Sequence, residues 1–204
     1  MPIHSIHIQK QSIIMNFSKY KITLASGSPR RKQMLEELGL SFVVKTKETD
    51  ETYPADLNTL EVAEYLAIKK AEAFKDTINN DELIITADTV VLTDNTILGK
   101  PKDRQEAYNM LKSLSGKAHK VISGVCLKTS ENKHSFSSTT EVYFKDLTDD
   151  EIYYYIDNYK PFDKAGAYGI QEWIGFIGVE RIDGSYFNVV GLPIQRLYTE
   201  LKKL

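Results

Sequence analysis

Residues 21–39 read KITLASGSPRRKQMLEELG, and this stretch predicts one strand–turn–helix unit. The first five residues form a short candidate strand, and Ser26-Gly27-Ser28 is a turn of small residues. A serine as N-cap, Pro29 at the first helical position and Gly39 after the last turn are typical punctuation of a helix.

Predicted helices and strands alternate along the rest of the chain. The sequence indicates a helix at 59–74 and another after Pro193. Two more helices are expected to begin at Asp103 and at Thr148, because each of these residues has a glutamate three positions later. Without internal repeats or a composition break, the predicted class is α/β or α+β, a mixed sheet with flanking helices. The expected strands lie at 42–44, 83–87, 90–93, 97–98, 118–128, 134–144, 173–179 and 186–190.

The composition is that of an ordinary globular protein, with 42% hydrophobic and 26% charged residues among 204. Twenty-six basic and 28 acidic residues leave a formal charge of −2, so no global basic field would recruit nucleic acid.

A single cysteine, Cys126, excludes an intramolecular disulfide and a cysteine-based zinc cluster, and a cytoplasmic location is expected. The longest apolar run, 83–92, is interrupted by Asp88, so no membrane segment is expected.

The N-terminal stretch MPIHSIHIQKQSIIMNF has no continuous apolar region and no arginine, so it is typical of neither a secretory signal nor a mitochondrial presequence. We expect residues 1–16 to lie outside a single domain at 17–204, and Met15 is a candidate internal start.

Several common catalytic signatures are absent: GxxxxGK[ST], GxGxxG, HExxH, GxSxG and CxxC. Polar clusters at predicted strand ends and turns are therefore the candidates for chemistry. The first is Ser26 to Lys32, where a helix N-terminus with Arg30 and Arg31 would suit phosphate oxygens. A capped helix start with solvated arginines is the structural alternative.

The second cluster is Asp88-Thr89, between apolar residues on both sides. Burying an unpaired carboxylate is costly, so we expect Asp88 at a strand break facing a cleft, with a structural ion pair as the alternative. Glu51 offers a further carboxylate, although a solvated surface pair with Asp50 is the simpler interpretation. Since magnesium takes one or two protein carboxylates plus substrate phosphates, Asp88 and Glu51 could hold it.

Two further clusters combine small and polar residues: Gly99-Lys100-Pro101, and Asp163 to Gln171, which reads DKAGAYGIQ. Small residues permit close approach of a ligand, while a plain glycine-rich connection is the alternative for both.

His119 could be a ligand or a base, but a lone histidine is more often structural. Tyr153-Tyr154-Tyr155 falls in a predicted helix and is expected to serve packing.

Taken together, the motifs resemble those of the Maf family of nucleoside triphosphate pyrophosphatases. They occur in the same order as in that family, they cover nearly everything from Ile22 to Leu204, and the AGAYGIQ form is similar to the subgroup acting on dTTP and UTP. The motifs are LASGSPRRKQML (24–35), ADTVV (87–91), GKP (99–101), MLxxLSGxxH (110–119), SGV (123–125), DKAGAYGIQ (163–171) and GSYFNVVGLP (184–193).

The resemblance implies a cytoplasmic enzyme, commonly a homodimer, with an inosine-triphosphatase-like fold in which two lobes enclose a central cleft. It implies that Asp88 is the catalytic acid–base residue and that Arg30, Thr89 and Gln171 shape the choice of substrate. A divalent metal, Mg²⁺ or Mn²⁺, is implied at Glu51 and Asp88. The other polar positions that match the family are Ser26, Arg31, Lys70, Lys100, Asp163 and Lys164.

The reaction expected from this resemblance is hydrolysis between the α and β phosphorus atoms of a nucleoside triphosphate. A nucleotide-sensing module without catalysis, acting for instance on cell division, is an alternative, although both carboxylates and the basic set are retained. A nucleotidyl- or sugar-nucleotide-transferring enzyme would share the phosphate chemistry but would need an acceptor pocket. Neither nucleic acid nor a membrane is expected as a partner.

Overall fold

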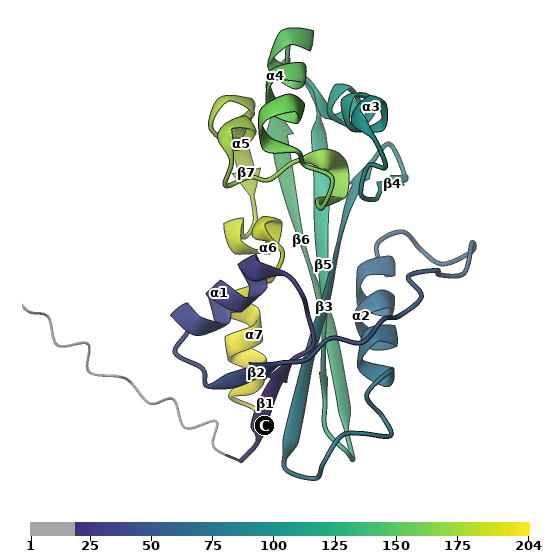
Figure 1. Ribbon diagram of the computed structural model, residues 1–204, viewed down its shortest axis with the longest axis vertical. Helices are drawn as coiled ribbons and strands as arrows, with labels where there is room; N and C mark the ends of the chain where they lie inside the picture. Colours follow the sequence, from purple (N-terminus) through teal and green to yellow (C-terminus); the bar gives the residue numbers. More distant parts are fainter. Residues whose placement is uncertain (1–18) are drawn as a thin grey trace, which may run out of the picture.

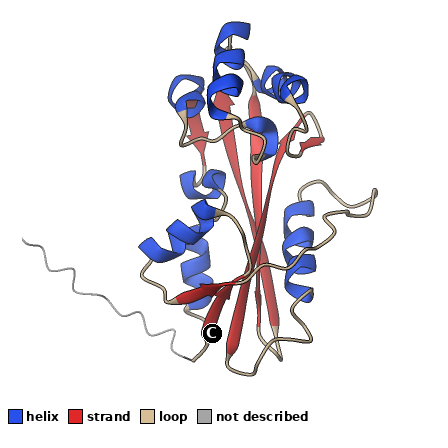
Figure 2. Ribbon diagram, viewed as in Figure 1, coloured by secondary structure: helices blue, strands red, loops and turns tan. Residues whose placement is uncertain are grey.

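The computed structural model describes residues 19–204, which form a mixed sheet flanked by helices (Figures 1 and 2). The predicted extension at residues 1–16 lies outside the described residues. Among the described residues, no helix is long and apolar enough to cross a membrane.

The sheet has seven strands in the order β2-β1-β3-β5-β6-β7, with β4 paired to β3 beside this path. Strand β1 is parallel to β2 and β3, and the other pairs are antiparallel. The long strands β3, β5 and β6 run the length of the molecule (Figure 1). The strands are β1 (Lys21–Leu24), β2 (Phe42–Val44), β3 (Glu82–Thr93), β4 (Thr96–Leu98), β5 (Ala118–Lys128), β6 (Lys133–Phe144) and β7 (Val179–Asp183).

The helices gather at the two ends of these long strands. Those at one end are α1 (Pro29–Glu37), α7 (Ile194–Leu201) and α2 (Val62–Glu72), with α2 lying across the sheet from the other two. Those at the far end are α3 (Arg104–Leu114), α4 (Asp149–Tyr159), α5 (Trp173–Gly178) and the short 3₁₀ turn η1 (Ala165–Ala167). Helix α6 (Tyr186–Val190) lies between the two groups, so the long strands connect two lobes (Figures 1 and 2).

Alternation along β3 distributes its side chains between two cores. Leu83, Ile85 and Val91 belong to the larger core, which also contains buried residues of α1, α3, α4 and α7. Val90 and Leu92 pack in a smaller core with α2. Because successive strand residues point to opposite faces, both sides of β3 are covered and its near-continuous apolar sequence is explained.

Helix caps agree with the predictions from sequence. The Ser28 hydroxyl accepts the Arg31 N–H at 3.4 Å and begins α1. At α4 the capping box of Thr148 and Glu151 is complete. Asp103 caps α3 by accepting a backbone N–H at 2.8 Å, although the reciprocal glutamate side chain bonds the N–H of residue 102 instead.

The predicted strands at 173–179 and 186–190 are wrong, because both stretches are helical. They form α5 and α6, and the strand between them, β7, starts only at Val179. Aromatic and β-branched residues suggested strands. Local packing overrides that preference: Gly175 sits so close to the carbonyl of Ile170 that a Cβ would overlap it, and Ser185 caps α6 at 3.4 Å.

The strand break predicted at Asp88 is also absent. Strand β3 runs unbroken from Glu82 to Thr93, and its register with β5 continues through the pair Asp88 and Gly124. The unbroken strand accommodates the Asp88 carboxylate, which is only 14% exposed, because it faces a cleft and pairs with Lys70 of α2.

Gly124 has a specific packing role. A Cβ built on it would overlap the backbone of Ala63 and Glu64 in α2. Only glycine therefore lets α2 lie directly on β5 at this point.

We expect Gly124→Ala to lower the free energy of unfolding by about 3 kcal/mol, because backbone atoms cannot move aside as a flexible side chain can. Urea unfolding would measure this loss. Gly99→Ala is the matched control, since nothing lies within 4 Å of its Cβ position. Equal stability of both variants would contradict the packing role of Gly124.

Candidate active site

A cleft of about 840 Å³ lies beside the middle of β3, between the start of α1, helix α2 and residues 163–172. Its lining comes from the β1–α1 turn, residues 46–51, α2, β3, the segment around 163–172 and residues 189–191. All of the site residues predicted from sequence line it, namely Ser26, Arg30, Arg31, Glu51, Lys70, Asp88, Thr89, Lys100, Asp163, Lys164 and Gln171.

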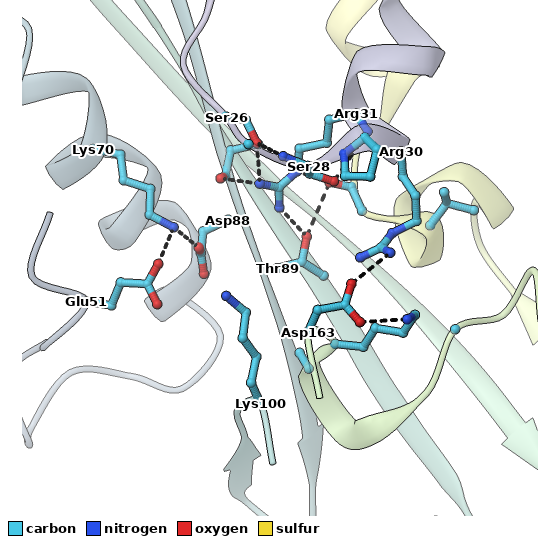
Figure 3. A pocket seen from close by; sticks show the side chains of 18 of the residues that line it. Ser26, Ser28, Arg30, Arg31, Glu51, Lys70, Asp88, Thr89, Lys100 and Asp163 are labelled. Carbon is cyan, nitrogen blue, oxygen red and sulfur yellow. Dashed lines mark hydrogen bonds and ion pairs between the residues drawn. The ribbon is translucent and has the colours of Figure 1, made fainter. Parts of the chain in front are cut away.

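The start of α1 faces the cleft with several hydrogen-bond donors. The Ser26 hydroxyl accepts the Ser28 N–H at 3.2 Å, which shapes the turn before the helix. Arg30 lies in the first turn of α1 and reaches toward Asp163, with Nη1 3.4 Å from the carboxylate (Figure 3). A helix N-terminus and an adjacent arginine make this wall suited to an anion.

Arg31 is bound by the protein more tightly than Arg30. Its Nε donates to the Gly191 carbonyl at 2.8 Å, Nη1 to the Ala87 carbonyl at 2.8 Å and to Ser26, and Nη2 to Thr89 at 3.1 Å. Burial lowers the pKa of Arg31 from the ordinary arginine value, and the charge of Asp88 opposes this effect. Most of the donors of its guanidinium fork are therefore used inside the protein.

Thr89 and Asp88 lie on opposite faces of β3, as strand alternation requires. Thr89 contacts Arg31 and shares a 2.8 Å hydrogen bond with Ser123, whose hydroxyl is also 3.0 Å from the Asn188 carbonyl. Asp88 points instead toward α2 (Figure 3).

Lys70 bridges the two candidate metal ligands. Its ammonium donates to Asp88 and lies 2.8 Å from the Glu51 carboxylate. The hydrogen bond from Lys70 is the main cause that lowers the pKa of Glu51. Two carboxylates from distant segments thus converge on one cation (Figure 3).

This pair fits a divalent cation that draws its other ligands from a substrate. In residues 19–204, no group of three or more histidine, cysteine, aspartate or glutamate side chains could hold a metal. Magnesium commonly binds through one or two carboxylates together with phosphate oxygens, which matches Glu51 and Asp88.

Residues 163–172 form the opposite wall of the cleft. Lys164 is nearly buried, with Nζ 2.7 Å from Asp163 and 3.0 Å from Glu172. The Gly166 N–H donates to the Gly99 carbonyl at 3.0 Å, which fixes this wall beside Lys100. Gln171 is exposed at the end of the wall.

Sequence reasoning missed four side chains that support this site: Ser123, Asn188, Tyr155 and Glu172. Their hydrogen-bond partners lie far away in the sequence, so local spacing gave no signal for these contacts. Ser123 and Asn188 do lie within the motifs SGV and GSYFNVVGLP.

His119 lies outside the cleft lining, with Nε2 2.7 Å from the Tyr168 hydroxyl, and burial lowers its pKa to about 4. The structural interpretation of this histidine is therefore the better one.

Comparisons with known proteins agree with these motifs. A family model described as Maf-like protein matches residues 21–204. A dTTP/UTP pyrophosphatase of Phocaeicola vulgatus is 58% identical over 193 residues, which cover 94% of this chain and 100% of the relative. One of Bacteroides thetaiotaomicron is 54% identical over 190 residues, or 93% and 98% of the two chains.

Among solved structures, the Staphylococcus aureus Ham1 protein aligns with a TM-score of 0.49 and 16% identity, covering 88% of this chain and 99% of that one. The family model spans almost all of the described residues, and the two relatives match over nearly their whole length. The chain belongs to the Maf family.

Proposed function

We propose that this protein is a nucleoside triphosphate pyrophosphatase that hydrolyses dTTP and UTP to the monophosphate and pyrophosphate. The observation that carries the proposal is one cleft holding a cationic helix start, a carboxylate pair and a segment ending in Gln171. Relatives named dTTP/UTP pyrophosphatase, at 53–58% identity over more than nine-tenths of this chain, support the same activity.

The triphosphate would bind along the wall formed by α1. Arg30 is half-buried and pairs with Asp163, which is 3.4 Å away and largely exposed, so this pair can open toward a phosphate at small cost. Lys100 is exposed at the rim. Arg31 would hold the turn that presents the backbone N–H groups and would contribute few donors of its own.

Hydrolysis would proceed by attack of water on the α phosphorus. The bond from this phosphorus to the bridging oxygen breaks, pyrophosphate leaves, and Asp88 accepts the proton of the attacking water. Glu51 and Asp88 would hold a divalent cation, Mg²⁺ or Mn²⁺, which when bound neutralises charge on the phosphates. Lys70 would then turn its ammonium from the carboxylates to a phosphate oxygen.

The resemblance to the family further supports a cytoplasmic homodimer that binds neither nucleic acid nor a membrane. The buried thiol of Cys126 agrees with a reducing compartment. A nucleotide-sensing module is the alternative function, but carboxylates, ammonium and guanidinium groups gathered in one cleft favour catalysis.

A panel of triphosphates with Mg²⁺ tests the function and its base preference. We expect pyrophosphate, with dTTP and UTP used within about tenfold of one another and ATP and GTP about 10²-fold more slowly, because a site that hydrogen-bonds one base edge rejects bases that leave it unpaired. Chromatography of nucleotides with separate assays of pyrophosphate and orthophosphate would measure this. Orthophosphate would contradict the reaction, and equal purine rates would contradict only the base preference.

We expect Asp88→Asn to keep the fold and lower turnover at least about 10²-fold, because an amide can neither accept the proton nor carry the full charge. Steady-state rates and thermal melting would be measured together. Asp94→Asn, at an exposed carboxylate that pairs with Lys117, is the matched control. Near-normal turnover of folded Asp88→Asn would remove Asp88 from the mechanism.

We expect Lys70→Met to bind Mn²⁺ without nucleotide at least about tenfold more tightly than the unchanged protein, because the two carboxylates lose their resident cation. Electron paramagnetic resonance of free Mn²⁺ measures this without catalysis. Lys69→Met is the control, since the neighbouring ammonium pairs with Asp50 instead. Unchanged Mn²⁺ affinity would show that the carboxylate pair is not the metal site.

A further inference from the structure

Tyr155 joins helix α4 to the wall of the cleft. Its side chain is fully buried in the core. Its hydroxyl donates to the Glu172 carboxylate and accepts the Gly169 N–H at 3.0 Å. The hydroxyl therefore ties two points of the 163–172 segment to a helix that does not itself line the cleft.

Glu172 extends this connection into a row of alternating charges. Its other carboxylate oxygen lies 3.0 Å from Lys164, and the same ammonium is 2.7 Å from Asp163. Asp163 in turn faces Arg30 across the cleft (Figure 3). The Lys164 side chain is only 9% exposed, so Glu172 supplies a counter-charge to a nearly buried cation.

Glycines lie on both sides of Gln171, and a Cβ at either would meet a neighbouring group. A Cβ on Gly169 would lie 2.9 Å from the Glu172 carboxyl carbon and 3.0 Å from Lys164. A Cβ on Gly175 would overlap the Ile170 carbonyl. The Glu172 N–H also donates to the Gly169 carbonyl at 2.9 Å, so Gln171 lies in a turn closed by a backbone hydrogen bond.

We propose that Tyr155 and Glu172 are positioning residues for base recognition, holding the backbone of 169–172 so that the Gln171 amide meets one edge of a uracil or thymine base. This inference rests on the function proposed above. A glutamine amide can accept from N3–H and donate to O4, but when flipped it fits cytosine equally well. Discrimination therefore depends on how firmly its surroundings are held.

Tyr155→Phe keeps the ring and removes only the hydroxyl, leaving the Gly169 N–H and one Glu172 oxygen without this partner. We expect the ratio of kcat/KM for dTTP to that for ATP to fall about tenfold, chiefly through a higher KM for dTTP. Glu172→Gln should shift the ratio in the same direction. Tyr154→Phe is the control, because that tyrosine is on the same helix but half exposed and packed on Trp173.

A double variant that also lacks the Gln171 amide distinguishes a positioning role of Tyr155 from a general effect on stability. In a Gln171→Ala background, Tyr155→Phe should change the dTTP/ATP ratio no further, since the group being positioned is already gone. Hydrogen exchange at the Gly169 amide should speed up in Tyr155→Phe and stay unchanged in Tyr154→Phe. The proposal would be overturned if Tyr155→Phe lowered the melting temperature but left the dTTP/ATP ratio unchanged. It would also be overturned if Tyr155→Phe lowered this ratio equally in the Gln171→Ala background.

Equilibrium binding of non-hydrolysable dTTP and ATP analogues gives the same ratio without catalysis. Absence of hydrolysis by the unchanged protein would refute the proposed function, while the binding ratio would still test the positioning role. We expect the unchanged protein to prefer the dTTP analogue and Tyr155→Phe to lose about tenfold of that preference. Equal preference in the two proteins would overturn the inference.

Discussion

The direct contact of helix α2 with β5 at Gly124 determines where the chemistry of this protein can occur. Without a side chain at that position, the backbone of Ala63 rests on the sheet. Lys70 follows on the same helix about two turns later and reaches the centre of β3, where it meets Asp88. A larger residue at position 124 would lift α2 and separate this pair, so one packing constraint positions the ammonium and the carboxylate together.

Strand alternation then divides the site between the two faces of the sheet. Asp88 turns toward α2 and its lysine, whereas Thr89 turns toward Arg31 and the hydroxyl of Ser123. Arg31 also binds main-chain carbonyls of β3 and of residue 191, so the turn before α1 is fixed relative to the strand. The Asp88 carboxylate belongs to strand β3, and the turn before α1 is attached to the same strand through Arg31.

Local signals in the sequence were sufficient to predict the helices that begin with clear capping residues. Ser28 and Pro29 identified the start of α1, and Thr148 with Glu151 identified α4. The stretches 173–179 and 186–190 were assigned wrongly because their aromatic and β-branched residues favour strands, while tertiary contacts such as Gly175 against Ile170 make them helical. Tyr155 was expected only to pack, since nothing in its helix reveals that its hydroxyl bonds Gly169 and Glu172.

Several charged groups of the cleft are paired with one another. Lys70 pairs with both Glu51 and Asp88, and Arg30 and Lys164 both face Asp163. In the proposed function, a triphosphate would exchange partners with these cations, and a divalent cation would take the place of Lys70 at the carboxylates. Lys164 also pairs with Glu172, so displacing Asp163 would not leave this nearly buried ammonium without a counter-charge.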